Sequence, residues 1–507
     1  MKNIFKILFL SLVVLSTSCE DELDINTNPN FPPEITPGLA LTSAQTSLAT
    51  VVGGELTNLG GFWSQYYTQS PSASQYEAMD QYNLNTDYAN RFWIETYAGC
   101  LNDLQFTIDK SNEAGDTGTA LIASLLKAYT FQLLVDLFDG VPYTEALQGE
   151  ENITPAPTPG QEIYADLITS IDAAIAAYNA NPVESTVGAQ DAIYNANMDD
   201  WMKFANTLKL KIYLRMAYTP QANPAAVNAL MAENNFITTD ASFKLFGTST
   251  GQENPFYAVQ VATTGLGPVN NVASNTLHDF YVNNDDERLE AAYRPNNDNT
   301  GYPSIPQGSG NEFNDTAAAY AKPNIRQQTP VFFISLTESY FLQAEASIRY
   351  GGGAGAAALY EAGIRASFDT YAVYFKKGNI GQEEPIWTQA EAAGYANTLI
   401  AGPYAYVPSG NVETALRQVI IQKWAALPNI NNIEAYIEST RTKFPEVVPE
   451  GTENYTIGNR IPSRISVLQG TQVPSILFYP DSEVERNPNM TQRTTLTQNV
   501  WWDQKPE

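Results

Sequence analysis

Apolar side chains recur about every three to four residues over most of this chain, which is the spacing of one helix face. The clearest example is residues 335–368, where Ser335 and Glu338 also form a capping-box pattern that begins a helix. Three consecutive glycines at 351–353 end that helix, because they lose too much backbone entropy to remain helical. The pattern then resumes, so this segment predicts two helices joined by a tight turn.

Further segments with the same periodicity lie on both sides of this pair, at about 39–58, 90–110, 119–140, 160–178, 199–218, 411–427 and 432–443. Residues 119–140 are apolar on nearly every side, which is typical of a helix at the centre of a core. We therefore expect a mainly α-helical fold with about four tetratricopeptide-like helix pairs. Such a pair cannot bury its own apolar face and needs neighbours to stack on.

The helical periodicity is interrupted twice. Residues 235–331 and 444–507 are rich in Gly, Asn, Pro and Thr, with short strand-like runs such as SFKLF and VFFI. We predict one unit over 39–507, in which a helical scaffold (39–234 and 332–443) carries an irregular, loop-rich lobe with short strands (235–331 and 444–507).

The first residues have the pattern of an export signal. Lys2 and Lys6 flank the start of an apolar run that is too short to span a membrane. This predicts a signal peptide over 1–18, and the small residue before Cys19 resembles a bacterial lipoprotein signal in which Cys19 is lipidated. An ordinary signal peptide with an incidental cysteine is the alternative. Residues 19–38 are first acidic and then rich in Asn and Pro, which predicts a tether and linker.

Charge and cysteine content exclude several classes of function. The formal net charge is −28, from 55 acidic and 27 basic side chains, and the chain has no basic stripe. Such a surface repels polyanions, so we do not expect a nucleic acid partner. The two cysteines, Cys19 and Cys100, are too few for a disulfide framework or a thiolate zinc cluster.

Candidate catalytic and metal motifs are incomplete. Residues 247–251 match a nucleophile elbow, but that motif needs a later histidine, and the chain's one histidine, His278, lies beside Asp279 in a polar segment. A loose calcium loop beginning at Asn296 would place Gln307 at its twelfth position, where a glutamate is required. We therefore predict no enzymatic activity, no cofactor and no metal.

An aromatic run without helical period lies between the first two helical segments. Its rings alternate with Ser, Gln and Asn, which suits a sugar: the ring stacks on the apolar face of a pyranose while amides pair its hydroxyls. Peptides fit nearly as well, and some of these rings, Trp63 among them, can instead belong to the core. The candidate ligand-binding residues are Trp63, Tyr66, Tyr67, Tyr76 and Tyr82.

Several segments together resemble the SusD/RagB nutrient-binding lipoproteins of Bacteroidetes outer membranes, in particular the SusD-like branch. They are DINTNPN at 24–30, WSQYYTQ at 63–69, DGVPYTEAL at 139–147, WMKFANTLKLKIYLRMA at 201–217, TESYFLQAEASIRYG at 337–351, IIQKWAAL at 420–427, EAYIESTRT at 434–442 and WWDQKP at 501–506. The resemblance implies a helical fold with four tetratricopeptide-like pairs and a non-enzymatic role. It further implies a lipid-anchored protein on the outer membrane that captures a nutrient, often a glycan, beside a SusC-type TonB-dependent transporter.

Three functions remain open from the sequence. The first is a surface lipoprotein that binds an oligosaccharide or a peptide and delivers it to such a transporter. The second is a surface enzyme acting on a glycan or peptide, which the incomplete motifs disfavour. The third is a helical scaffold that binds only proteins, which the aromatic run and the predicted lipid disfavour.

Overall fold

The computed structural model describes residues 35–505. The predicted signal peptide (1–18), Cys19 and all but the last residues of the predicted tether lie outside the described residues. The first half contains helices α2 (Pro37–Val51), α3 (Thr57–Trp63), α4 (Glu77–Asp80), α5 (Asn90–Ile94), α6 (Asn102–Ala114), α7 (Thr117–Phe138), α8 (Gly160–Ala180), α9 (Met198–Arg215) and α10 (Pro224–Glu233). Two π-helical turns, Val52–Leu56 and Glu95–Leu101, make α2–α3 and α5–α6 continuous.

The second half adds α11 (Pro255–Gln260), α12 (Asn275–Asn283), α13 (Arg288–Ala292), α14 (Leu336–Tyr350), α15 (Ala356–Tyr374), α16 (Gln389–Ala401), α17 (Val412–Ala426), α18 (Asn432–Thr442) and α19 (Asp481–Val484). The strands are short and pair antiparallel in twos: β1 (Tyr67–Gln69) with β5 (Asn271–Ala273), β2 (Val141–Pro142) with β3 (Pro157–Thr158), β4 (Ala241–Phe243) with β8 (Val331–Ile334), β6 (Tyr293–Arg294) with β7 (Lys322–Pro323), and β9 (Lys376–Lys377) with β10 (Glu384–Pro385). The prediction of a mainly helical fold with few short strands is confirmed.

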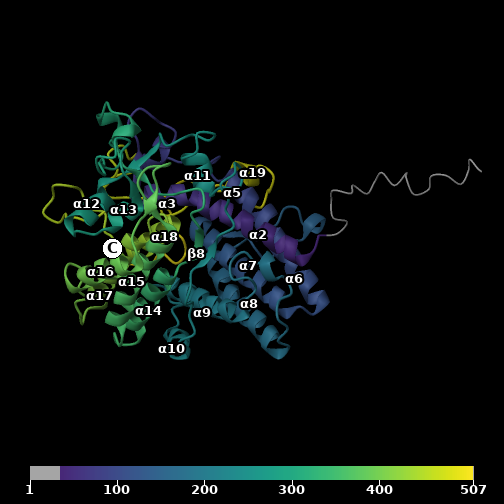
Figure 1. The fold of residues 1–507 in the computed structure, drawn as a ribbon. Coiled ribbons are helices and arrows are strands. Elements are labelled where there is room, and N and C mark those ends of the chain that lie inside the picture. The colour runs from purple at the N-terminus through teal and green to yellow at the C-terminus, as the bar shows by residue number, and fades with distance from the viewer. Residues whose placement is uncertain (1–34, 506–507) are drawn as a thin grey trace, which may run out of the picture.

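Helices from the two halves of the chain lie on opposite sides of the molecule (Figure 1). α6, α7 and α8 lie on one side and α14 to α17 on the other, with α9 and α10 between them, while loop segments of both halves gather at the top of the view. The predicted central helix is α7, whose mean hydropathy reaches 1.5. That helix is long and apolar enough to cross a membrane, but 89% of its apolar window is buried in the protein, as in the core helix of a globular domain.

The helix pair predicted at 335–368 is present as α14 and α15, and its turn contains Gly352 and Gly353 with positive φ. The predicted capping box is only half formed. Ser335 Oγ accepts a hydrogen bond from the backbone N–H of Glu338 at 3.1 Å. The carboxylate of Glu338 does not return to the helix start, because it lies 2.9 Å from Lys211 Nζ in the core.

The first helix continues past its expected end near Asn58 and reaches Trp63 through two glycines. A Cβ on Gly60 would lie 2.3 Å from the backbone of Asn432 and Ile433, so α3 crosses α18 at direct backbone contact. Only glycine permits this approach, and the close packing offsets its poor helix propensity. The two glycines therefore mark a helix crossing and do not end the helix.

Charged side chains form a buried cluster between five helices of the scaffold. The cluster alternates cations and carboxylates, each at most 4% exposed: Asp136 on α7, Lys211 and Arg215 on α9, Glu338 and Glu345 on α14, Lys423 on α17, and Glu434, Glu438 and Arg441 on α18. Every member lies next to an opposite charge, so these ion pairs connect helices that are far apart in sequence.

Candidate functional site

Four of the five aromatic residues predicted to bind ligand belong to the core. The residues at most 2% exposed are Trp63, Tyr66, Tyr67 and Tyr82. Tyr66 donates its hydroxyl to the backbone carbonyl of Trp424, and Tyr67 donates to the side chain of Asn429. No ring face of these four is available to a ligand, so their proposed binding role was wrong.

The polar neighbours that suggested a solvent-facing loop are themselves buried. Gln65 is fully enclosed, accepts hydrogen bonds from the Thr276 hydroxyl at 2.8 Å and from the Ile461 N–H at 2.9 Å, and lies in a turn with φ of 61°. Ser64 donates to the carbonyl of Asn432 at 3.3 Å. These amides and hydroxyls form hydrogen bonds with other parts of the fold, as buried polar groups usually do.

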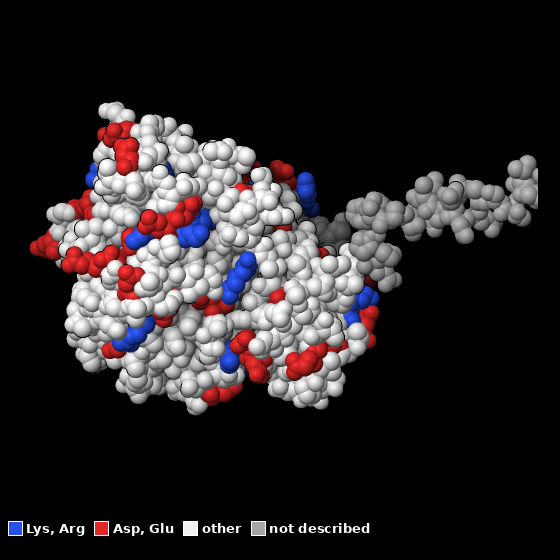
Figure 2. All heavy atoms as spheres, viewed as in Figure 1, with Lys and Arg blue, Asp and Glu red and all other residues white. Residues whose placement is uncertain are grey.

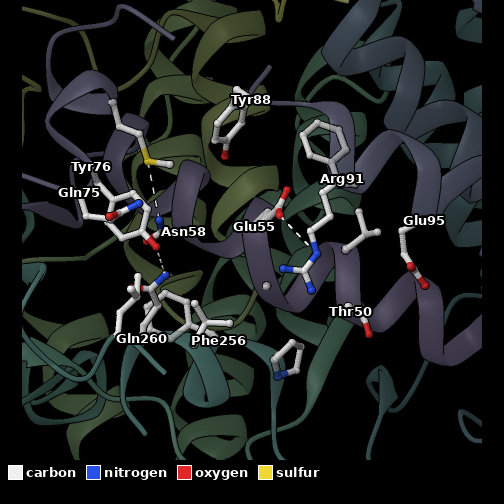
Figure 3. A pocket seen from close by; sticks show the side chains of 17 residues that line it. Thr50, Glu55, Asn58, Gln75, Tyr76, Tyr88, Arg91, Glu95, Phe256 and Gln260 are labelled. Atoms are coloured by element: carbon white, nitrogen blue, oxygen red, sulfur yellow. Dashed lines mark hydrogen bonds and ion pairs between the residues drawn. The ribbon is translucent and has the colours of Figure 1, made fainter. Parts of the chain in front are cut away.

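Tyr76, the fifth candidate, is half-buried and lines a pocket of about 380 Å³. The walls come from the end of α2 and the π-helical turn after it, from α5, from the segment around Tyr76, and from α11. In Figure 3, Tyr76 and Gln260 lie on one side of the pocket and Arg91 on the other, with Glu55 between them. The volume falls within the range of about 300–1,000 Å³ that is common for small-molecule sites.

The floor of the pocket is aromatic and apolar. Phe256, Phe92 and Met79 are almost fully buried and present only part of their surface, whereas Tyr76 and Tyr88 are half-buried. Val259 and Leu266 remain exposed at the rim. The pocket therefore has a buried apolar floor and an exposed apolar rim. A ligand that covers the rim would remove apolar surface from water, which is favourable.

Several polar side chains that line the pocket have atoms without a hydrogen-bond partner, and a ligand could provide one. The side-chain amide of Gln260 donates to the Tyr76 hydroxyl, which fixes the ring. Within residues 35–505, the second oxygen of Glu55, the Tyr88 hydroxyl and the amide oxygen of Gln260 are buried without a hydrogen bond. An unpaired buried polar group costs about 1–3 kcal/mol. These three atoms are closed to solvent, so a ligand rich in hydroxyls or amides would satisfy them once their side chains turn toward it.

Glu55 and Arg91 form a weak ion pair across the pocket, with 4.0 Å between Oε1 of Glu55 and Nε of Arg91. Burial raises the pKa of Glu55, and the charge of Arg91 partly opposes that shift. Burial also raises the pKa of Tyr88 well above its ordinary value, and the charge of Glu55 adds to the shift. Tyr88 therefore remains a neutral hydroxyl at physiological pH.

The sequence motifs considered for catalysis and metal binding lack the required surroundings. Ser249 lies in a bend between β4 and α11 and adjoins neither, whereas a nucleophile elbow is a sharp turn directly between a strand and a helix. His278 pairs with its neighbour Asp279 at 2.7 Å. The side-chain oxygen of Asn296 accepts the Thr300 N–H at 2.9 Å, and the described part of the chain holds no cluster of three His, Cys, Asp or Glu residues suited to a metal.

Residues 29–467 match the model of the SusD-like proteins, described as starch-binding and associating with the outer membrane. The chain belongs to the SusD-like family. Solved SusD-like structures have the same fold. A protein described as chitin-binding has a TM-score of 0.72 and 24% identity, over 92% of this chain and 100% of its own.

A SusD/RagB family protein from Bacteroides thetaiotaomicron has a TM-score of 0.71 and 21% identity, over 94% of this chain and 100% of its own. A chitin-binding SusD homologue from Flavobacterium johnsoniae has a TM-score of 0.70 and 20% identity, over 92% of this chain and 98% of its own. Comparison with curated protein sequences finds no match.

Several of the segments that carry the SusD-like resemblance lie in the helical scaffold. WMKFANTLKLKIYLRMA is α9 and EAYIESTRT is α18, and both contribute to the buried charge cluster. The pocket residues Glu55, Tyr88, Phe256 and Gln260 come from segments far apart in sequence and follow no local motif. Only Tyr76 carried a sequence signal, as one ring of the aromatic run.

Proposed function

We propose that this SusD-like protein is a nutrient-binding lipoprotein of the outer membrane that captures an oligosaccharide in the Tyr76 pocket. The observation that carries the proposal is the combination of Tyr76 and an apolar floor with three unpaired buried polar groups. A pyranose offers an apolar C–H face for the ring and hydroxyls for the polar groups. The starch-binding description of the family supports the same ligand class.

The lipid on Cys19 and delivery to a SusC-type TonB-dependent transporter complete the proposal. A binder held outside the cell needs a channel to move its ligand inward, and the family's association with the outer membrane supports that location. We propose that 39–507 act as one unit, since strands of the loop-rich lobe pair with scaffold segments, as β1 does with β5. A tagged protein purified from native membranes in mild detergent should carry a TonB-dependent barrel with it. Recovery of the lipoprotein alone, with the transporter expressed, would contradict delivery.

Calorimetric titration with neutral oligosaccharides and with oligopeptides tests the binding role. Tyr76→Ala should weaken binding of the sugar at least tenfold, which is about 1.4 kcal/mol, because it removes the stacking face. Tyr76→Phe should retain most of the affinity, since the ring remains. Tyr340→Ala provides the control, because Tyr340 is also half-buried but lies on α14 and does not line the pocket.

The titration results distinguish a sugar ligand, a peptide ligand and a ligand that binds elsewhere. Binding of sugars that depends on Tyr76 and not on Tyr340 supports the proposal. Binding of peptides alone would assign the pocket to a peptide nutrient. Absence of binding to either class, or equal affinities for Tyr76→Ala and the original protein, would refute the assignment of the ligand to this pocket.

A further inference from the structure

Three basic side chains meet inside the loop-rich lobe with little negative charge around them. Arg294 on β6, Lys322 on β7 and Arg326 are 4%, 3% and 8% exposed. Arg294 and Lys322 stand directly opposite each other in the β6–β7 pair. Like charges at such positions destabilise a sheet. This arrangement contrasts with a protein of net charge −28, whose visible face in Figure 2 carries acidic side chains widely and basic ones only in small, scattered groups.

The three cations differ in the hydrogen bonds and counter-charges that the protein provides for them. Arg326 donates to the Asn324 side chain at 3.1 Å and to the backbone carbonyl of Gly378 at 2.6 Å, and it lies 3.4 Å from the Glu383 carboxylate. These contacts hold the β9–β10 hairpin in place, so Arg326 has a structural role.

Arg294 has fewer partners. Its Nε donates to the Pro323 carbonyl at 3.1 Å. Among the described residues, no acceptor or carboxylate within 4.0 Å is found for its two terminal nitrogens, and these atoms are not among the fully buried unpaired ones, so they keep some contact with solvent. The Lys322 ammonium donates to the Asn297 side chain at 2.9 Å and to the Tyr320 carbonyl at 3.2 Å, but it also has no carboxylate partner in the described chain. Several N–H donors of two adjacent buried cations are therefore available.

The electrostatic strain appears in the pKa values of these groups. Burial, together with the charge of Arg326, lowers the pKa of Arg294 to about 9, and the more distant Tyr257 and Glu383 oppose this shift only in part. Burial and the charge of Arg294 lower the pKa of Lys322 to about 8. A buried charge that lacks a counter-charge is strongly unfavourable. A bound anion would remove this penalty for both groups at once.

We propose that Arg294 and Lys322 form a binding site for an oxyanion, of the kind carried by an acidic sugar as a carboxylate or sulfate ester. The planar guanidinium offers parallel N–H donors that match the two oxygens of such a group, and the lysine adds a point charge beside it. The phenol of Tyr257, on α11, interacts electrostatically with Arg294.

The site is separate from the Tyr76 pocket, because neither Arg294 nor Lys322 lines that pocket. α11 nevertheless contributes to both places, through Phe256 and Gln260 to the pocket and through Tyr257 to the cations. A failure of sugar binding at Tyr76 would leave the oxyanion site untouched, so the two proposals can be tested independently.

The test measures binding of inorganic sulfate, glucuronate and glucose to the purified protein by calorimetry, with sodium chloride keeping the ionic strength constant. We expect saturable binding of sulfate or glucuronate and none of glucose at this site. Arg294→Met should weaken that binding at least tenfold. Lys322→Gln should weaken it as well, while the amide retains a donor toward Asn297 and preserves the fold. Arg365→Met, which removes an exposed arginine of α15, should leave the affinity unchanged.

Thermal denaturation without added anion separates binding from a purely structural role. Removing an unneutralised buried cation should leave the midpoint of Arg294→Met unchanged or raise it, whereas a structural arginine would lower it. Binding of glucuronate alone indicates that the anion arrives on a sugar, and binding of sulfate alone indicates a free ion. Equal responses of the original protein, Arg294→Met and Arg365→Met to both anions would overturn the proposal.

Discussion

The buried charge cluster predicts that Glu434→Gln strongly destabilises the protein. Three cations contact the Glu434 carboxylate oxygens: Lys211 Nζ at 2.8 Å, Arg215 Nη2 at 2.9 Å and Lys423 Nζ at 3.0 Å. All four side chains are at most 3% exposed. Glutamine has nearly the same shape but carries no charge, so the substitution leaves three cations with less negative charge around them.

Two estimates of the magnitude agree. Removal of one partner from a buried ion pair costs about 3–5 kcal/mol. Burial alone would raise the pKa of Glu434, but the charges of Arg215, Lys211 and Lys423 outweigh it and hold the pKa at about 2, against 4.5 in the unfolded chain. That difference corresponds to about 3 kcal/mol. Because the folded pKa is the lower one, this stability is present above about pH 4.5 and is lost as the pH falls toward 2.

Urea denaturation at pH 7 measures the effect, with Glu361→Gln as the matched control. Glu361 pairs with Arg365 at 3.2 Å on the surface of α15, where the two side chains are 34% and 42% exposed. An exposed pair of this kind contributes about 0–1 kcal/mol. We expect Glu434→Gln to lower the free energy of unfolding by about 3 kcal/mol or more. A loss no larger than that of the control would refute the view that the cluster holds the scaffold together.

Three further predictions follow from individual residues. Tyr67→Ala should lower the free energy of unfolding by about 3–5 kcal/mol, measured in urea, because the ring is fully buried; an unchanged value would contradict its place in the core. Cys19→Ala should move the protein out of the outer-membrane fraction, and its retention there without a partner would contradict lipidation. Burial, opposed by three hydrogen bonds, raises the pKa of Asp80 to about 7. The stability of the original protein relative to Asp80→Asn should therefore fall as the pH rises from about 4 to about 7, and a difference independent of pH would contradict the raised value.

The long helices of the scaffold could be predicted from the sequence because their apolar stripes are local. The period along 119–140 already indicates a buried helix, and α7 is that helix. The extent of the first helix could not be predicted, since Gly60 and Gly61 break helices unless a second backbone lies against them. That second backbone, at Asn432, is far away in sequence.

The candidate site was harder to predict from the sequence for a related reason. Polar residues beside aromatic rings are consistent with a binding loop, but here Gln65 and its neighbours form internal hydrogen bonds with segments more than 200 residues away. The pocket depends on the approach of α11 to the segment around Tyr76, which no local pattern encodes. Of the five candidates, Tyr76 lines the pocket because part of the aromatic run reaches the surface between Ser72 and Ala78.

A crystal structure of the protein with the oligosaccharide that binds most tightly in calorimetry tests the central claim most directly. We expect the sugar ring to lie against Tyr76, with hydroxyls near the Tyr88 hydroxyl and the Gln260 amide oxygen, both of which lack partners within the described residues. Density for the sugar on another face, with the Tyr76 pocket filled only by water, would contradict the assignment of ligand binding to this site.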